Sequence, residues 1–168
     1  MPNQPEIWLR GPLPNVPALL QPAAHALLQA YDDVAVALDN FPDSLLWERP
    51  AGLASVGFHL RHIAGVQDRM LTYARSEALT EAQFTHLKNE AQPNTQTAND
   101  LLTYLRTQTD RTLTYLHGVD PGTLPDFRPV GRTALPSTVG GLLFHAAEHS
   151  MRHVGQLLVT ARVLVAGL

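Results

Sequence analysis

The chain has 168 residues, of which 45% are hydrophobic and 16% charged, and its formal net charge is −3. We expect one soluble domain over residues 1–168, because this length and apolar fraction can build a full hydrophobic core. Only 12 residues are Lys or Arg and they form no basic stripe, so nucleic acid is not expected as a partner. The absence of cysteine excludes disulfides, thiolate metal ligands and cysteine nucleophiles.

The N-terminal region differs in composition from the rest of the chain. It has neither the basic start nor the apolar segment of a secretory signal, and no run of about 18 apolar residues follows anywhere. We therefore expect a cytoplasmic protein with no membrane partner. Six prolines within the first 22 residues predict an extended lead-in over residues 1–17, packed on a helical body formed by residues 18–168.

The first half of the chain predicts two long helices. Helical spacing of apolar residues indicates a first helix from residue 18 or 22 to about residue 40, ending before Pro42. A loop follows over residues 41–54. Ser55 has the residue type and position of an N-cap for a second helix over roughly residues 55–76.

The middle of the chain predicts a third long helix after a less regular segment. Residues 78–95 are partly helical in pattern and are interrupted by Pro93. Thr97 or Asn99 can begin the third helix, which then continues to about Leu116.

The last third of the chain combines a long connection with the fourth predicted helix. The connection covers residues 118–136, and loops beyond about 12–15 residues without regular structure are uncommon and often functional. The only candidate for β-structure is a short hairpin within residues 126–136. Ser137 is the predicted N-cap of the fourth helix, which runs to about Ala166.

Four long amphipathic helices predict an all-α protein of the four-helix-bundle type. In such a bundle, side chains from several helices can converge on one ion in the core. The residues predicted to face the core are Leu27, Tyr31, Val34, Leu38, Leu101, Leu105, Leu113, Leu116, Leu142, Ala146, Leu157, Ala161 and Leu164.

The fourth predicted helix carries a column of histidines at every fourth position, His145, His149 and His153. Helical residues four apart lie about 6 Å apart along the axis, whereas residues eight apart lie about 12 Å apart. Only one adjacent pair can therefore share an ion with metal–nitrogen bonds of about 2.1 Å. The second predicted helix offers His59 and His62 on nearly one apolar face. We predict a metal site rather than a water-bridged network of neutral imidazoles.

A second pattern overlaps this column. Residues 145–149 match H-x-x-E-H, the signature of inverted zinc proteases, in which Glu148 would be the general base. Such a site needs a further ligand downstream, yet no His, Asp or Glu follows His153. Glu148 also lies four residues before Arg152, so an ordinary surface salt bridge explains it. We reject the protease interpretation.

Two segments, SVGFHLRHIAGVQDRMLTYA and LPSTVGGLLFHAAEHSMRHVGQLLVTA, resemble the DinB/YfiT-like family of small helical metal-binding proteins. The similarity runs from about residue 18 to the end, and its most specific part is H-x-x-x-H followed by VGQ. The resemblance implies a four-helix bundle with an up-down-down-up order of helices. It also implies one divalent ion held by three histidines, often within a homodimer.

By position, the resemblance places the three metal ligands on His62, His149 and His153. Three neutral imidazoles leave at least one coordination position open, as in catalytic metal sites. All-nitrogen ligation suits zinc, nickel, copper or iron, and we expect zinc first and nickel second.

The remaining polar residues near the motifs receive other roles. His59, three residues before His62, is a candidate for an additional ligand or for a residue that orients one. His145 and Gln156 are the candidate catalytic residues, able to contact a bound ligand. Three arginines could bind a carboxylate, although a solvated surface position is the more common explanation for each of them. They are Arg61, Arg132 and Arg152.

The resemblance also indicates a chemistry, since characterised relatives include transferases and isomerases that use bacillithiol, mycothiol or glutathione. A divalent cation lowers the thiol pKa from about 8.5, which makes a thiolate available at neutral pH. We therefore expect a metal-dependent S-transferase whose partners are a low-molecular-weight thiol and an electrophilic substrate. Two alternatives remain open, a metal-dependent hydrolase and a non-catalytic, stress-associated metal-binding dimer.

Overall fold

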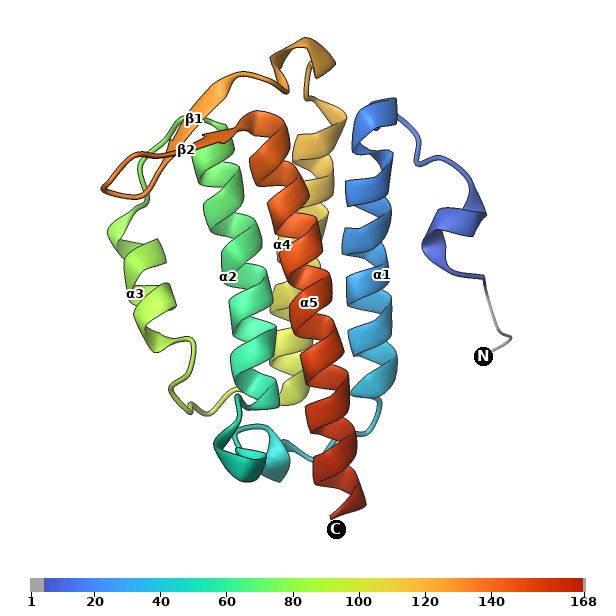
Figure 1. Cartoon of the computed structure of the whole chain (residues 1–168). Coiled ribbons are helices and arrows are strands. Elements are labelled where there is room, and N and C mark those ends of the chain that lie inside the picture. The colour runs from blue at the N-terminus through green and yellow to red at the C-terminus, as the bar shows by residue number, and fades with distance from the viewer. Residues whose placement is uncertain (1–4, 168) are drawn as a thin grey trace.

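The computed structural model describes residues 5–167, and most of them are helical (Figure 1). The predicted all-α class is confirmed. The helices are α1 (Gln21–Ala37), α2 (Val56–Ala74), α3 (Glu81–Asn89), α4 (Ala98–His117) and α5 (Val139–Ala166). The strands β1 (Phe127–Val130) and β2 (Leu135–Thr138) form an antiparallel hairpin. Short 3-10 turns lie at Ile7–Arg10, Ala18–Leu20, Asp43–Leu45, Pro50–Gly52 and Pro121–Thr123.

The four long helices pack side by side as a bundle. Helix α5 contacts α1 and α2, and α4 contacts the same two helices from the other side. Helices α1 and α5 run in one direction and α2 and α4 in the opposite direction (Figure 1). The short helix α3 lies outside this group and packs on α2. None of the helices within residues 5–167 is long and apolar enough to cross a membrane.

Side-chain caps fix most helix starts where the sequence indicates them. The Ser55 hydroxyl accepts a hydrogen bond from Phe58 N at the start of α2, and Thr97 caps α4 through a reciprocal pair with Asp100. The prediction for α5 was wrong by one residue. Ser137 pairs with Arg128 in the hairpin, so the cap of α5 is Thr138.

The hairpin predicted within residues 126–136 is confirmed, although β2 extends two residues further to Thr138. It joins α4 to α5 and contacts α2 through β1. Arg128 Nε donates to Ala74 O over 2.9 Å and so ties the hairpin to the end of α2.

The N-terminal lead-in was predicted as extended, but a 3-10 turn forms at Ile7–Arg10. Ile7 is buried, and its backbone N donates to the Gln29 side chain on α1 over 2.9 Å. The lead-in thus contacts α1 at Ile7 and Gln29. The first four residues of the predicted lead-in lie outside the described residues, as does Leu168 at the end of the helical body.

The core consists of two apolar clusters stacked along the bundle axis. One gathers around Leu60 and Leu157, and the other around Leu27, Leu71 and Leu143. Tyr31, Leu113 and Leu164 are half-buried, and the other residues predicted for the core are buried. On α2, α4 and α5, a layer of buried polar residues lies between the residues of the two apolar clusters. It consists of Gln67, Gln108, Thr109, Thr112 and Ser150.

Candidate metal centre

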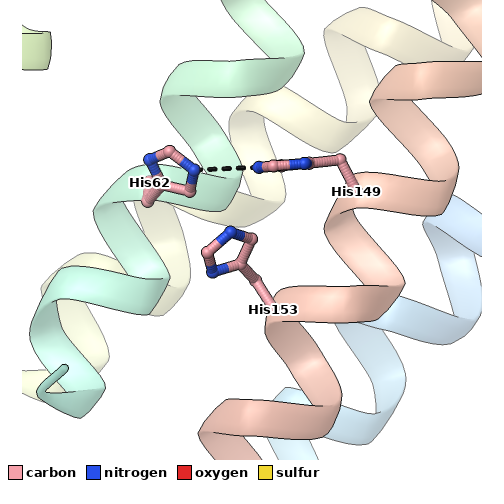
Figure 2. A group of neighbouring side chains, drawn as sticks. All are labelled: His62, His149 and His153. Carbon is pink, nitrogen blue, oxygen red and sulfur yellow. Dashed lines mark hydrogen bonds between the residues drawn. The ribbon is translucent and has the colours of Figure 1, made fainter. Parts of the chain in front are cut away.

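Three histidines from two neighbouring helices face one another beside this polar layer. His62 on α2 and His149 and His153 on α5 each offer a ring nitrogen, and these atoms all lie within 4.8 Å of one another (Figure 2). His62 Nε2 is 3.0 Å from His149 Nε2. Since nitrogen–metal bonds are about 2.1 Å long, nitrogens at these separations can share one ion. The fold thus brings together the three histidines that the family resemblance implied as ligands.

The protonation of this group supports a cation between the rings. The Glu90 carboxylate can only accept, so His62 Nδ1 donates to it over 2.6 Å, and in the neutral form of this ring the lone pair lies on Nε2. His149 Nδ1 is buried and has no hydrogen-bond partner among residues 5–167. If Nδ1 carries the proton of a neutral His149 ring, the lone pair of His149 lies on Nε2. It then faces the lone pair of a neutral His62 across 3.0 Å, an arrangement that a shared cation stabilises. If His149 Nδ1 does not carry the proton, a buried acceptor remains unpaired. Imidazole nitrogens are also ligands that suit divalent zinc or nickel.

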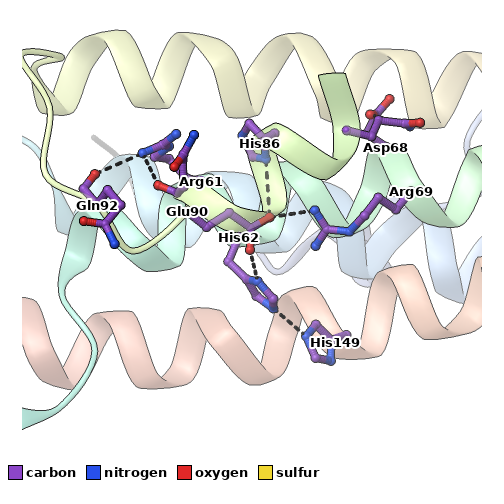
Figure 3. Close-up of polar contacts among 10 residues, drawn as sticks. Arg61, His62, Asp68, Arg69, His86, Glu90, Gln92 and His149 are labelled. Atoms are coloured by element: carbon purple, nitrogen blue, oxygen red, sulfur yellow. Dashed lines mark hydrogen bonds and ion pairs between the residues drawn. The ribbon is translucent and has the colours of Figure 1, made fainter. Parts of the chain in front are cut away.

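Glu90, directly after α3, is the residue of the site that sequence analysis missed. Its carboxylate is 3% exposed and accepts hydrogen bonds from His62 Nδ1 and from Arg69, both over 2.6 Å (Figure 3). His86 Nδ1 lies 3.3 Å away. Burial raises the pKa of Glu90, but the contacts with His62, His86 and Arg69 outweigh it and lower that pKa to about 2. An ionised carboxylate behind a ligand fixes the tautomer and orientation of its imidazole.

Gly65 provides the space through which Glu90 reaches α2. A Cβ at this position would collide with Glu90 Oε1 and press on Arg69 and His86. We expect Gly65→Ala to lower the free energy of unfolding by about 1–3 kcal/mol through overpacking, and to weaken metal binding by displacing Glu90. Chemical denaturation and metal titration measure the two effects.

The matched control for this prediction is Gly155→Ala on α5, where nothing lies within 4 Å of the added Cβ. There the better helix propensity of alanine should raise stability by up to about 1 kcal/mol. Equal behaviour of the two variants would contradict the role assigned to Gly65.

His59 lies behind His153 and outside the group of three. It is 2% exposed, and its Nδ1 is 3.0 Å from His153 Nδ1. If His153 Nδ1 donates, His153 Nε2 keeps its lone pair for the site, and His59 acts as the acceptor that orients the ring. This geometry favours a positioning role for His59 over ligation.

Burial favours the neutral form of His59, His149 and His153. Burial, followed by the charge of His62, lowers the pKa of His59 to about 4. The same causes, with smaller contributions from neighbouring charges, lower the pKa of His149 to about 4 and that of His153 to about 3. Because neutral imidazole is the form that binds metals, these groups need no deprotonation at pH 7.

These pKa values make the stability of the metal-free protein depend on pH. The unfolded chain takes up protons near pH 6.5, whereas the folded chain resists them until about pH 4. The free energy of unfolding should therefore fall as pH drops from about 6.5 to 4, by up to about 1.4 kcal/mol per pH unit for the fully buried His59. The half-buried His149 and His153 contribute less because solvent screens them.

Urea unfolding between pH 7.5 and 4.5 tests this expectation. His59→Leu should flatten the acid limb, whereas the control His117→Gln, at the exposed end of α4, should leave it unchanged. A stability that stays constant over this range would contradict the prediction.

The other candidates from the sequence lie at the margin of the site. His145 Nδ1 donates to Glu148 over 2.8 Å, and Glu148 forms the expected salt bridge with Arg152 over 2.6 Å. Gln156 is exposed, and we find no hydrogen bond from its side chain within residues 5–167.

The three arginines considered as carboxylate binders have structural partners in the fold. Arg152 forms the salt bridge described above. Arg61 donates to the backbone oxygens of Asn89 and Gln92 and so holds the chain after α3 in place (Figure 3). The Arg132 guanidinium lies 5.7 Å from the ring centroid of Phe84 on α3.

A helical bundle with three facing imidazoles on adjacent helices defines a class of all-α proteins with a candidate metal centre. The family model described as the DinB superfamily matches residues 26–157. The chain therefore belongs to the DinB superfamily, and the family predicted from the sequence is confirmed.

A conserved protein from Enterococcus faecalis, known from a crystal structure, has a similar fold. The comparison gives a TM-score of 0.68 and 21% sequence identity, and it covers 88% of this chain and 97% of that one. At this identity the similarity shows the fold alone. No curated protein is similar enough to this chain to count as a relative.

Proposed function

We propose that this protein binds one divalent cation, zinc or nickel, through His62, His149 and His153. The observation that carries the proposal is the approach of three ring nitrogens to within 4.8 Å. The ionised Glu90 behind His62 and the low pKa values of His149 and His153 support it. Three protein ligands leave a coordination position for a substrate atom.

We further propose that the protein is an S-transferase that uses a low-molecular-weight thiol such as bacillithiol. The chain contains no cysteine, so the reacting sulfur has to come from a substrate. The bound cation would stabilise the thiolate, which is only a minor form at neutral pH while the thiol pKa is about 8.5. A sulfur–carbon bond forms, the leaving group departs with its electron pair, and the thiol proton passes to solvent. His145 and Gln156 are our candidates for contacting these substrates.

A metal-dependent hydrolase is the less favoured candidate, because it needs a general base near the ion. Glu148 is the nearest carboxylate on α5, but Arg152 and His145 occupy it. Burial is the largest single effect and raises the pKa of Glu148, but the contacts with Arg152 and His145 together outweigh it and lower that pKa, which makes the carboxylate a weaker base. A non-catalytic metal-binding dimer is the third candidate.

Cobalt substitution separates the three functions. We expect the visible spectrum of the cobalt-loaded protein to shift when bacillithiol, mycothiol or glutathione is added, and the thiol to be consumed with an electrophile. Ester or amide turnover without thiol would favour the hydrolase. No spectral shift and no turnover, with an unchanged dimer after metal removal, would favour the binding protein. Light scattering tests the homodimer that we propose.

A further inference from the structure

A second group of potential ligands lies one helical turn along α5 from the first. His145, Glu148 and His149 each offer a nitrogen or oxygen atom, and these atoms lie within 4.8 Å of one another. His149 belongs to both groups. We propose that His145, Glu148 and His149 form an outer cation site, which captures a divalent ion from solvent and passes it to the inner group.

The spacing on α5 suits this role. Positions i, i+3 and i+4 lie on one face of a helix, so the three outer side chains can close on one ion from a single turn. His145 Nδ1 already lies 2.8 Å from Glu148 Oε1. The ring centroids of His145 and His149 are 4.9 Å apart, and those of His149 and His153 are 4.6 Å apart. The histidine column therefore consists of two pairs, His145–His149 and His149–His153, whose ring centroids are similarly far apart.

Exposure and charge distinguish the two groups. The side chain of His145 is 44% exposed and that of Glu148 is 28% exposed, whereas that of His62 is 17% exposed. Arg152 holds Glu148 Oε2, while Glu148 Oε1 faces His145. The outer group thus presents solvent with an imidazole and a carboxylate oxygen, two ligand types that divalent cations accept, while Arg152 balances the charge of the carboxylate.

The shared histidine provides continuity between the two sites. An ion held by the outer group can exchange His145 and Glu148 for His62 and His153 without leaving His149. Both groups need His149, so the outer site is a transient one in the native protein. The loading role rests on the inner metal centre proposed above. Binding of an ion at the outer site does not depend on that proposal.

The first experiment isolates the outer site by disabling the inner one. We expect the folded double variant His62→Ala/His153→Ala to bind one Ni²⁺ weakly in a calorimetric titration. Adding His145→Ala and Glu148→Gln should abolish this binding, while adding His117→Ala, at the exposed end of α4, should not. Absence of binding in the double variant, or binding indifferent to residues 145 and 148, would overturn the proposal.

The second experiment uses the otherwise native protein and follows Ni²⁺ loading by stopped flow and its release to a chelator. A staging site lowers the barrier in both directions, so His145→Ala should slow loading and release by the same factor. The equilibrium Kd should then stay the same. Unchanged rates would refute the loading role. Failure of the native protein to bind Ni²⁺ tightly would refute the inner centre, and the double variant would still decide whether the outer site exists.

Discussion

Replacing His153 with alanine should abolish stoichiometric metal uptake while the helical fold persists. His62 and His149 then provide only two nitrogens at the inner centre, and the outer group of His145, Glu148 and His149 should hold an ion too weakly to keep it through purification. We expect the affinity to fall by more than about 100-fold, beyond the 10–100-fold typical when a residue that merely supports a ligand is removed. Elemental analysis of the purified variant measures the occupancy, and circular dichroism measures the helix content.

The fold should survive because the bundle does not depend on the ion for its core. Two apolar clusters, built around Leu60 and Leu157 and around Leu71 and Leu143, hold the four long helices together. His153 itself is half-buried, so its truncation opens no large cavity.

His145→Ala is the matched control, since it removes the other neighbour of His149 in the column. We expect it to retain full occupancy at equilibrium. Full occupancy in His153→Ala, or loss of the ion in His145→Ala, would show that the metal is held by the other histidine pair.

Local patterns were sufficient to predict the long helices and the hairpin. Apolar spacing and the caps Ser55 and Thr97 depend only on residues close in sequence, and they define α2 and α4 well. The start of α5 depends instead on strand pairing, which places Ser137 opposite Arg128 and moves the cap to Thr138. Helix α3 also depends on distant contacts, because Gln83 on α3 binds Asp68 on α2.

The residues of the metal centre also divide into those that local sequence patterns predict and one that depends on distant contacts. The fourfold spacing of the column shows that only one adjacent pair can bind, and the family resemblance selects His149 and His153. Glu90 could not be predicted in this way, since it lies 28 positions from His62 on a segment with a weak helical pattern. Only the packing of α3 on α2 brings its carboxylate to His62.

Replacing Glu90 with glutamine should affect both metal affinity and stability. The amide nearly preserves the shape of the side chain, but it removes the negative charge that faces Arg69 and His62. Loss of the carboxylate behind His62 should weaken metal binding by about 10–100-fold. Arg69, 6% exposed, would be left without its counterion, and breaking a buried ion pair in this way costs about 3–5 kcal/mol. Metal titration and urea unfolding measure the two losses.

The double variant Arg69→Met/Glu90→Gln separates these two effects. Methionine removes the unpaired charge of Arg69 and fills a similar volume, so most of the lost stability should return. Metal affinity should not return, because His62 Nδ1 still lacks an anionic acceptor. Recovery of both properties together would mean that Glu90 acts only through the ion pair that anchors α3. Recovery of stability alone means that its carboxylate also sets the ligand strength of His62.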